Sequence, residues 1–203
     1  MFKFKRKKFF DHYRTVFGPL TQELVDALED LLAAIEADNS WGSSDSELRQ
    51  IAYFLATAKW ETAHTFRPIN ERGGDDYFNT KYGPTTKIGK KLGNIKAGDG
   101  ARFHGRGYVQ LTGRDNYKRA GDILKADLIG QPDLALVPNL AYKIAIRGMK
   151  EGWFTGKKLS SYFKEGTPPD YTNARRIINE LDKADTIADI ARKMMETLRH
   201  SKV

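Results

Sequence analysis

The 203-residue sequence contains no cysteine. This absence excludes disulfides, thiol nucleophiles, zinc–thiolate sites and iron–sulfur clusters. Long apolar runs are also missing, since no stretch of about 18 apolar residues could span a membrane. The basic start leads into Phe9-Phe10-Asp11 and not into the apolar core of a secretion signal. We therefore expect no signal peptide and a protein that is made and held in the cytoplasm.

Motifs for metal and nucleotide chemistry are absent as well. The four histidines show no HExxH spacing, and no acidic loop matches a calcium-binding hand. The sequence has neither a phosphate-binding loop nor a Gly-x-Ser-x-Gly nucleophile elbow. We expect no metal and no cofactor, so that any chemistry depends on carboxylates, hydroxyls and amides.

What remains is a soluble globular composition with an excess of positive charge. Hydrophobic residues make up 40% of the chain and charged residues 30%, which fits one domain with a real core. The formal net charge is +8, and five of these charges lie within residues 1–8. Because the rest of the chain carries only +3, the chain is not basic throughout, and we expect no nucleic-acid partner.

The uneven charge predicts a basic N-terminal tail, residues 1–8, before a single domain, residues 9–203. One interpretation of the tail is a frayed, solvated end. The other is an anchor on anionic lipid or wall polymer, in which Phe2 and Phe4 lie between the charges.

Helical periodicity dominates the rest of the sequence. Apolar residues recur at helical spacing over residues 20–35, and Ser44 with Glu47 forms a capping box that opens a second helix to about Ala63. Further helical patterns cover residues 114–124, 140–151, 172–179 and 186–198. Glycines and turn signals crowd residues 67–107, which predicts a long loop region with short strands. The expected fold is mainly α, with at most a small β-hairpin.

Two glutamates are candidates for acid–base chemistry. Glu61 lies near the end of the second predicted helix, at the border of its apolar face. A carboxyl group among apolar side chains keeps its proton more readily, as a general acid must; the alternative is an exposed glutamate at a helix end. Glu71 follows ten residues later, beside Arg72. One acid and one base carboxylate form a glycoside hydrolase site, whereas an ion pair with Arg72 is the alternative for Glu71.

A third candidate is the segment His104–Thr112, HGRGYVQLT. Its two glycines allow a tight turn around Arg106. The alternation that follows predicts an extended segment with a polar face formed by Tyr108, Gln110 and Thr112. Gln110 and Thr112 would hydrogen-bond a sugar or a water, although Thr112 with Asp115 also fits a helix cap.

Together these elements resemble glycoside hydrolase family 19, which comprises plant-type chitinases and many phage endolysins. The helix-borne glutamate triplet of the family appears as Trp60-Glu61-Thr62. Its central motif appears as His104–Thr112 followed by Asn116-Tyr117, and its Ile-Asn-Gly appears as Ile178-Asn179-Glu180. The resemblance runs from about Phe9 to Leu198. It implies a lysozyme-like, α-rich fold of two lobes with a substrate cleft.

The resemblance also implies roles for single residues. Glu61 would be the general acid and Glu71 the base, with Thr112 helping to hold the attacking water. The substrate-binding candidates are Gln110, Asn116 and Asn179, to which the central motif adds Arg106 and Tyr108. The expected stereochemistry is inversion, for which the two carboxyl groups stand about 6.5–9.5 Å apart.

Departures from the family pattern favour a bacterial wall substrate. The loop to the second glutamate is shorter than in the chitinases, His104 replaces a tyrosine, Glu180 replaces a glycine, and the plant disulfides are missing. Peptidoglycan is anionic and attracts a protein of charge +8, whereas chitin is neutral. We expect a monomeric endolysin of the N-acetylmuramidase type that is released from the host cytoplasm, cleaves peptidoglycan glycan strands and lyses the cell. The alternatives are a chitinase, a lytic transglycosylase and a catalytically inactive glycan-binding protein.

Overall fold

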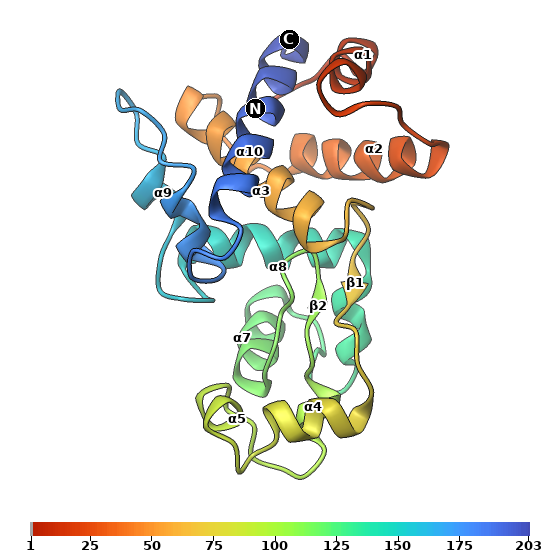
Figure 1. Cartoon of the computed structure of the whole chain (residues 1–203), viewed down its shortest axis with the longest axis vertical. Coiled ribbons are helices and arrows are strands. Elements are labelled where there is room, and N and C mark those ends of the chain that lie inside the picture. The colour runs from red at the N-terminus through yellow and green to blue at the C-terminus, as the bar shows by residue number, and fades with distance from the viewer. Residues whose placement is uncertain (1) are drawn as a thin grey trace. The chain divides into compact units, whose positions relative to one another are not determined.

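A computed structural model describes residues 2–203 and divides the chain into two compact units. Unit 1 consists of residues 1–66 and 148–203, and unit 2 consists of residues 67–147. Both are built mainly from helices, as predicted, and the strands of the described residues form a two-stranded sheet (Figure 1). Within residues 2–203 no helix combines the length and the apolar character needed to cross a membrane.

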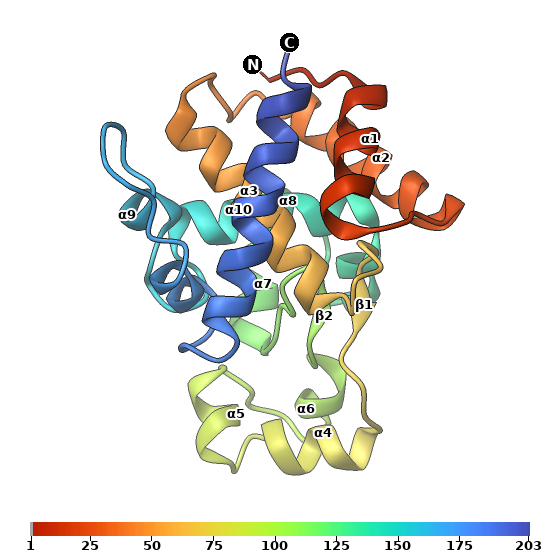
Figure 2. The same ribbon diagram turned by 45° about the horizontal axis from the view of Figure 1, so that its top comes forward.

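Unit 1 is built around one buried helix. Its elements are α1 (Arg6–Phe17), α2 (Gln22–Ala37), α3 (Asp45–Glu61), the end of α8 (Pro138–Glu151), α9 (Leu159–Tyr162), the 3-10 helix η2 (Asn173–Ile177) and α10 (Ala184–Ser201). Every residue of α3 from Gln50 to Ala58 is buried, which identifies α3 as the core helix of its unit. Helix α10 lies along α3, as Figures 1 and 2 show. The last residue of α3, Glu61, is therefore at the end of a rigid support.

The start of α3 confirms the predicted capping box. The hydroxyl of Ser44 accepts a hydrogen bond from the backbone N of Glu47 at 3.2 Å, and the Glu47 carboxylate accepts one from the backbone N of Ser44 at 3.3 Å. Such a cap stabilises a helix by about 1 kcal/mol. Four further predicted helices are confirmed as α2, α7, α8 and α10, but residues 172–179 contain only the five-residue 3-10 helix η2.

Residues 2–8 are folded into unit 1, which corrects the prediction of a basic tail. Phe2 and Phe4 are 1% and 5% exposed, and Phe4 is bridged to Lys202 near the other end of the chain, so that the two termini lie close together (Figure 2). Arg6 opens α1, and its guanidinium donates hydrogen bonds to two glutamates of α2. Burial of both phenylalanines excludes a frayed end and an anchor that exposes them.

Unit 2 holds the short elements of the fold. These are β1 (Ile69–Asn70), α4 (Asp75–Tyr82), α5 (Lys87–Lys91), α6 (Asp99–Arg102), β2 (Arg106–Gly107), α7 (Arg114–Leu124), the 3-10 helix η1 (Pro132–Leu136) and most of α8. Strands β1 and β2 are antiparallel, with Ile69 opposite Gly107. The predicted loop region therefore contains three helices. The prediction failed because helices of four to eight residues are too short to show an apolar period.

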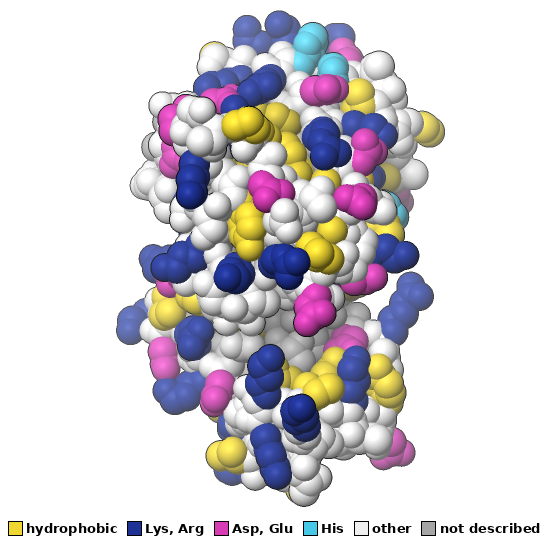
Figure 3. All heavy atoms as spheres, turned by 60° about the vertical axis from the view of Figure 1, so that its left-hand side comes forward, with side chains coloured by type: hydrophobic (Ala, Val, Ile, Leu, Met, Phe, Trp, Pro, Cys, Tyr) yellow, Lys and Arg dark blue, Asp and Glu magenta, His cyan; other side chains and the backbone are white. Residues whose placement is uncertain are grey.

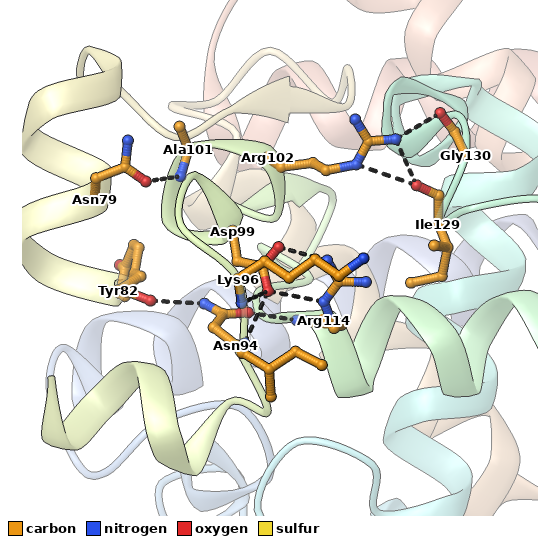
Figure 4. A network of polar contacts seen from close by, with 11 residues as sticks. Asn79, Tyr82, Asn94, Lys96, Asp99, Ala101, Arg102, Arg114, Ile129 and Gly130 are labelled. Atoms are coloured by element: carbon orange, nitrogen blue, oxygen red, sulfur yellow. Dashed lines mark hydrogen bonds and ion pairs between the residues drawn. The ribbon is translucent and has the colours of Figure 1, made fainter. Parts of the chain in front are cut away.

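The segment that joins α5 to α7 is held by two buried polar side chains, Asn94 and Asp99 (Figure 4). Asn94 donates to the backbone oxygen of Tyr82 and accepts from the backbone N of Arg114. The Asp99 carboxylate accepts from the Arg114 guanidinium at 2.5 and 2.8 Å and from two backbone N–H groups of its own loop. Burial opposes the charged form of Asp99, but these hydrogen bonds outweigh burial and lower its pKa from 3.8 to about 2.

Replacing Asp99 with Asn is expected to destabilise the protein by about 3 kcal/mol, because the mostly buried Arg114 loses its charged partner. A lowered carboxylate pKa contributes stability above the unfolded-state pKa, and this stability is lost as the pH falls toward the folded-state value. The effect of Asp99→Asn should therefore be complete at pH 7 and fade between about pH 4 and pH 2.

Urea unfolding at both ends of this pH range measures the effect. The matched control is Asp122→Asn, which breaks an exposed ion pair with Lys118 and should cost far less than Asp99→Asn because solvent screens the pair. Equal losses for the two variants at pH 7 would contradict the structural role of Asp99.

Candidate functional site

Glu61 carries the carboxylate at the end of α3 in unit 1. Its side chain is 18% exposed, and Oε1 accepts a 2.5 Å hydrogen bond from Nη1 of Arg175. Arg175 is itself 3% exposed and also donates to the backbone oxygen of Asp182. A buried cation thus fixes the direction of the carboxylate, while part of the Glu61 side chain stays open to solvent.

The chain leaves Glu61 through an unusual turn. Ala63, His64 and Phe66 have φ angles of 51°, 69° and 54°, a left-handed conformation that residues other than glycine rarely adopt. Local contacts hold the turn, because the Thr62 hydroxyl accepts from the backbone N of Phe66 and the Phe66 ring is fully buried. Strained backbone of this kind gathers at functional sites, so the turn is a second sign, independent of the carboxylate, that this helix end has a function.

Glu71 lies in unit 2, just after β1, and its carboxylate accepts three hydrogen bonds. Oε1 accepts from the Tyr82 hydroxyl at 2.8 Å and from Nζ of Lys81 at 3.0 Å. Oε2 accepts from the backbone N of Gly105 at 3.2 Å. The ion-pair partner of Glu71 is thus Lys81 and not the neighbouring Arg72.

Both side-chain donors to Glu71 keep their protons at neutral pH. Burial opposes the charge on Lys81, yet hydrogen bonds with Tyr82, Tyr77 and Glu71 raise the pKa of Lys81 above its usual 10.5. Burial raises the pKa of Tyr82, and its hydrogen bond to Glu71 acts in the same direction. Glu71 therefore has an ammonium and a hydroxyl donor that orient its carboxylate.

Gly105 brings Glu71 and Gln110 together. A Cβ atom at Gly105 would lie 2.6 Å from Oε1 of Gln110 and 3.1 Å from Oε2 of Glu71, so both side chains pack directly against this glycine. Gln110 donates from Nε2 to the backbone oxygen of Ile69 and has a left-handed φ of 56°. Two of the predicted site residues are thus neighbours within unit 2.

The residues around Gln110 turn back and do not form the predicted extended segment. Arg106 and Leu111 exchange two backbone hydrogen bonds, of 3.1 and 2.8 Å, which closes a tight turn. The expected alternation of faces fails because a turn, unlike a strand, does not point successive side chains to opposite sides. Tyr108, predicted to line a polar face, is 1% exposed.

Arg106 is also occupied by the protein itself. Its side chain is 7% exposed and donates to the carboxylate of Asp133, to the Tyr117 hydroxyl and to the backbone oxygen of Arg102. These contacts hold β2 against η1. The burial of Arg106 and Tyr108 argues for structural roles and against direct contact with a saccharide.

The remaining predicted residues are reachable. Thr112 does not cap α7, whose first flanking residue is Gly113; its hydroxyl donates to the backbone oxygen of Gln110 at 2.8 Å. Asn116 is half-buried and donates to the backbone oxygen of Thr112. Thr112 and Asn116 therefore extend the Glu71–Gln110 group along the chain of unit 2. Asn179 is exposed and belongs to unit 1, just after η2.

A groove of about 950 Å³ lies elsewhere in unit 2, and none of the predicted site residues lines it. Three acidic and three basic side chains contribute to its walls: Asp115, Asp122, Asp127, Arg114, Lys118 and Lys125. This balance selects for no charged ligand. Over residues 2–203 no group of three or more His, Asp or Glu side chains is placed to hold a metal ion.

The fold and these carboxylates define a class of protein, namely a mainly helical, lysozyme-like protein with one acid–base candidate in each unit. The sequence profile of the family described as chitinase class I, glycoside hydrolase family 19, matches residues 25–158. This match covers well over half of the chain. The chain belongs to glycoside hydrolase family 19.

Curated relatives are plant chitinases. Chitinase 8 of Oryza sativa subsp. japonica is 35% identical over 95 residues, which cover 47% of this chain and 32% of the rice protein. The acidic endochitinase SP2 of Beta vulgaris is 31% identical over 126 residues, which cover 62% of this chain and 39% of the beet protein. The chain thus spans less than half of the length of these relatives.

Solved structures share the fold. The crystal structure of chitinase C from Streptomyces griseus HUT6037 matches with a TM-score of 0.63 at 21% identity, covering 96% of this chain and 92% of that one. A class IV chitinase from Zea mays matches with a TM-score of 0.57 at 17% identity, covering 94% and 90%. At such identities the likeness establishes the architecture alone.

Sequence reasoning missed the partners of both carboxylates. Arg175 is 114 residues from Glu61, and no local pattern links the two. The pair Arg175-Arg176 precedes the apolar pair Ile177-Ile178, but nothing in the sequence distinguishes the arginine that is buried from the one that is exposed. Lys81 and Tyr82 could not be linked to Glu71 because α4, which carries them, was expected to be a loop.

Proposed function

We propose that the protein is an endolysin-type hydrolase that cleaves β-1,4 glycosidic bonds in the glycan strands of bacterial peptidoglycan, as an N-acetylmuramidase. The observation that carries the proposal is the state of Glu61 within a glycoside hydrolase family: a partly exposed glutamate side chain at the end of a buried helix, oriented by a buried arginine.

The proposed roles follow from the contacts of each carboxylate. Glu61 donates a proton to the glycosidic oxygen as the bond breaks, and Arg175 stabilises the carboxylate that this step leaves behind. Glu71, oriented by Lys81 and Tyr82, accepts a proton from the attacking water. Gln110 packs beside Glu71 and offers an amide to the saccharide or the water.

Charge supports peptidoglycan as the substrate. Peptidoglycan carries carboxylates, and a protein of net charge +8 is attracted to it over a distance set by the salt concentration. Chitin is the second candidate, because the relatives of this chain are named chitinases. Chitin is neutral and gives no reason for the charge.

Mass spectrometry of the fragments formed from purified peptidoglycan in oxygen-18 water tests the proposal. We expect one oxygen-18 atom at a reducing muramic acid, because hydrolysis adds the oxygen of water to the new end. Label at a reducing glucosamine would identify a glucosaminidase, and an unlabelled anhydro end would identify a lytic transglycosylase.

Chitin oligosaccharides serve as the comparison substrate. Cleavage of these together with intact peptidoglycan would replace the proposal with a chitinase. Binding to peptidoglycan without the release of any fragment would replace it with a glycan-binding protein.

A further inference from the structure

Residues 77–98 of unit 2 contain five lysines and no acidic residue. One of them, Lys81, is paired with Glu71. The other four are exposed, and none takes part in an ion pair with the carboxylates of the described residues: Lys87, Lys90, Lys91 and Lys96. Figure 3 shows Lys and Arg side chains gathered at the lower end of the view, in the region of α5. These four lysines are an unneutralised positive surface.

Two large apolar side chains belong to the same segment. Ile88 is 49% exposed and Ile95 is 71% exposed, both high values for isoleucine. Exposed isoleucines among exposed lysines give this segment both the apolar and the positively charged side chains that an interfacial contact combines. We call the four lysines with Ile88 and Ile95 the α5 patch.

The backbone of the α5 patch is rigid, so the exposure of the isoleucines is built into the fold. A Cβ atom at Gly89 would lie 1.9 Å from the backbone oxygen of Gly83, which shows how closely α5 is pressed onto the chain after α4. At the other end of the patch, buried Asp99 accepts hydrogen bonds from the backbone N–H groups of Ile95 and Lys96 (Figure 4). These hydrogen bonds fix the backbone of the loop, so that Ile95 is held on the surface.

We propose that the α5 patch binds the surface of an anionic lipid bilayer. The lysines contact the phosphates of the head groups, and Ile88 and Ile95 enter the interface between head groups and acyl chains. The isoleucines favour lipid over an anionic wall polymer. Lysines alone are enough to bind the charges of a polymer, whereas a bilayer also offers apolar surface to the isoleucines. The anchor expected at residues 1–8 is ruled out there by the burial of Phe2 and Phe4.

Co-sedimentation with phosphatidylcholine vesicles, with and without phosphatidylglycerol, tests the α5 patch. The full-length protein should bind only the anionic vesicles, and added salt should weaken the binding. Each lysine near such a surface changes the affinity by roughly fivefold, so Lys90→Gln with Lys91→Gln should lower it by about twenty- to thirtyfold. Ile95→Ser should lower it by a further measurable factor.

The matched control is Lys5→Gln with Lys8→Gln, which makes the same change in net charge on exposed lysines of unit 1. Binding of this control should stay within about twofold of the wild type. Equal losses of vesicle binding in the two double variants would overturn the proposal for the α5 patch, because net charge alone would then determine the affinity. Unchanged binding of Ile95→Ser to the vesicles would overturn the choice of lipid, and so would a loss of cell-wall binding by Lys90→Gln with Lys91→Gln that equals its loss of vesicle binding. The vesicles contain no glycan, so this assay can fail without any bearing on hydrolysis.

Discussion

Replacing Glu61 with Gln is expected to lower the hydrolysis of peptidoglycan by about a thousandfold, because the amide has no proton to give to the leaving oxygen. The amide oxygen can still accept the hydrogen bond from Arg175, and the side chain is the same size. Folding should be retained, but the missing charge opposite a guanidinium that is 3% exposed should cost about 3 kcal/mol of stability, as for Asp99→Asn. Release of soluble fragments from purified cell walls, read beside a thermal unfolding curve, measures both effects.

Glu47→Gln is the control on the same helix. Glu47 lies in the capping box at the start of α3, and glutamine is also accepted at this position of the box. This variant should keep the activity of the wild type, so any general effect of losing a negative charge on α3 is accounted for. Activity of Glu61→Gln within tenfold of the wild type would remove Glu61 from the proposed mechanism.

Replacing Glu71 with Gln is expected to lower kcat by about a hundredfold, the lower part of the range for the loss of a general base. The carboxylate accepts from Tyr82, Lys81 and Gly105. An amide has only one oxygen, so one of these donors would face an NH₂ group. The substitution therefore removes the base and also disturbs its support, and KM should change less than kcat because Glu71 is assigned to the water and not to the sugar.

Tyr82→Phe separates the two effects of the Glu71 substitution. It keeps the carboxylate and removes one of its donors, so we expect a smaller loss together with a changed pH profile of kcat. The products of Glu71→Gln are equally informative. Full activity with an anhydro product would show that one carboxyl group is enough and would contradict a base role for Glu71.

The parts of the fold that could be predicted are those with a local cause. Ser44 and Glu47 lie three residues apart, and their capping box was confirmed, as were the long helices with a complete apolar face such as α2 and α10. Helix α1 was missed because its lysines suggested a tail, although Phe9, Phe10 and Tyr13 form its buried face. The short helices of unit 2 were missed for lack of length.

In the candidate site, too, only the features with a local cause in the sequence could be predicted. Glu61 and Glu71 are predicted from helix position and motif, and Gln110 from the central segment, and their catalytic and binding roles stay predictions. The contacts that orient these side chains could not be predicted from the sequence. A tight turn places Gln110 beside Glu71, and Arg175, which bonds to Glu61, is far away in the chain. The same turn buries Tyr108, whose place on a polar face rested on an alternation that only a strand has, and Arg106, whose predicted saccharide contact rested on the central motif.

Unit 1 is discontinuous in the chain, and this sets the order in which the protein can be completed on the ribosome. Residues 67–147 form one uninterrupted stretch and can fold while synthesis continues. Helix α3 emerges earlier but must wait for α10, which follows unit 2 in the chain. Glu61 likewise meets Arg175 only after all of unit 2 has been made. A chain that ends before Arg175 would keep its inserted unit and leave Glu61 without its partner, so the proposed acid depends on residues that are made only after unit 2.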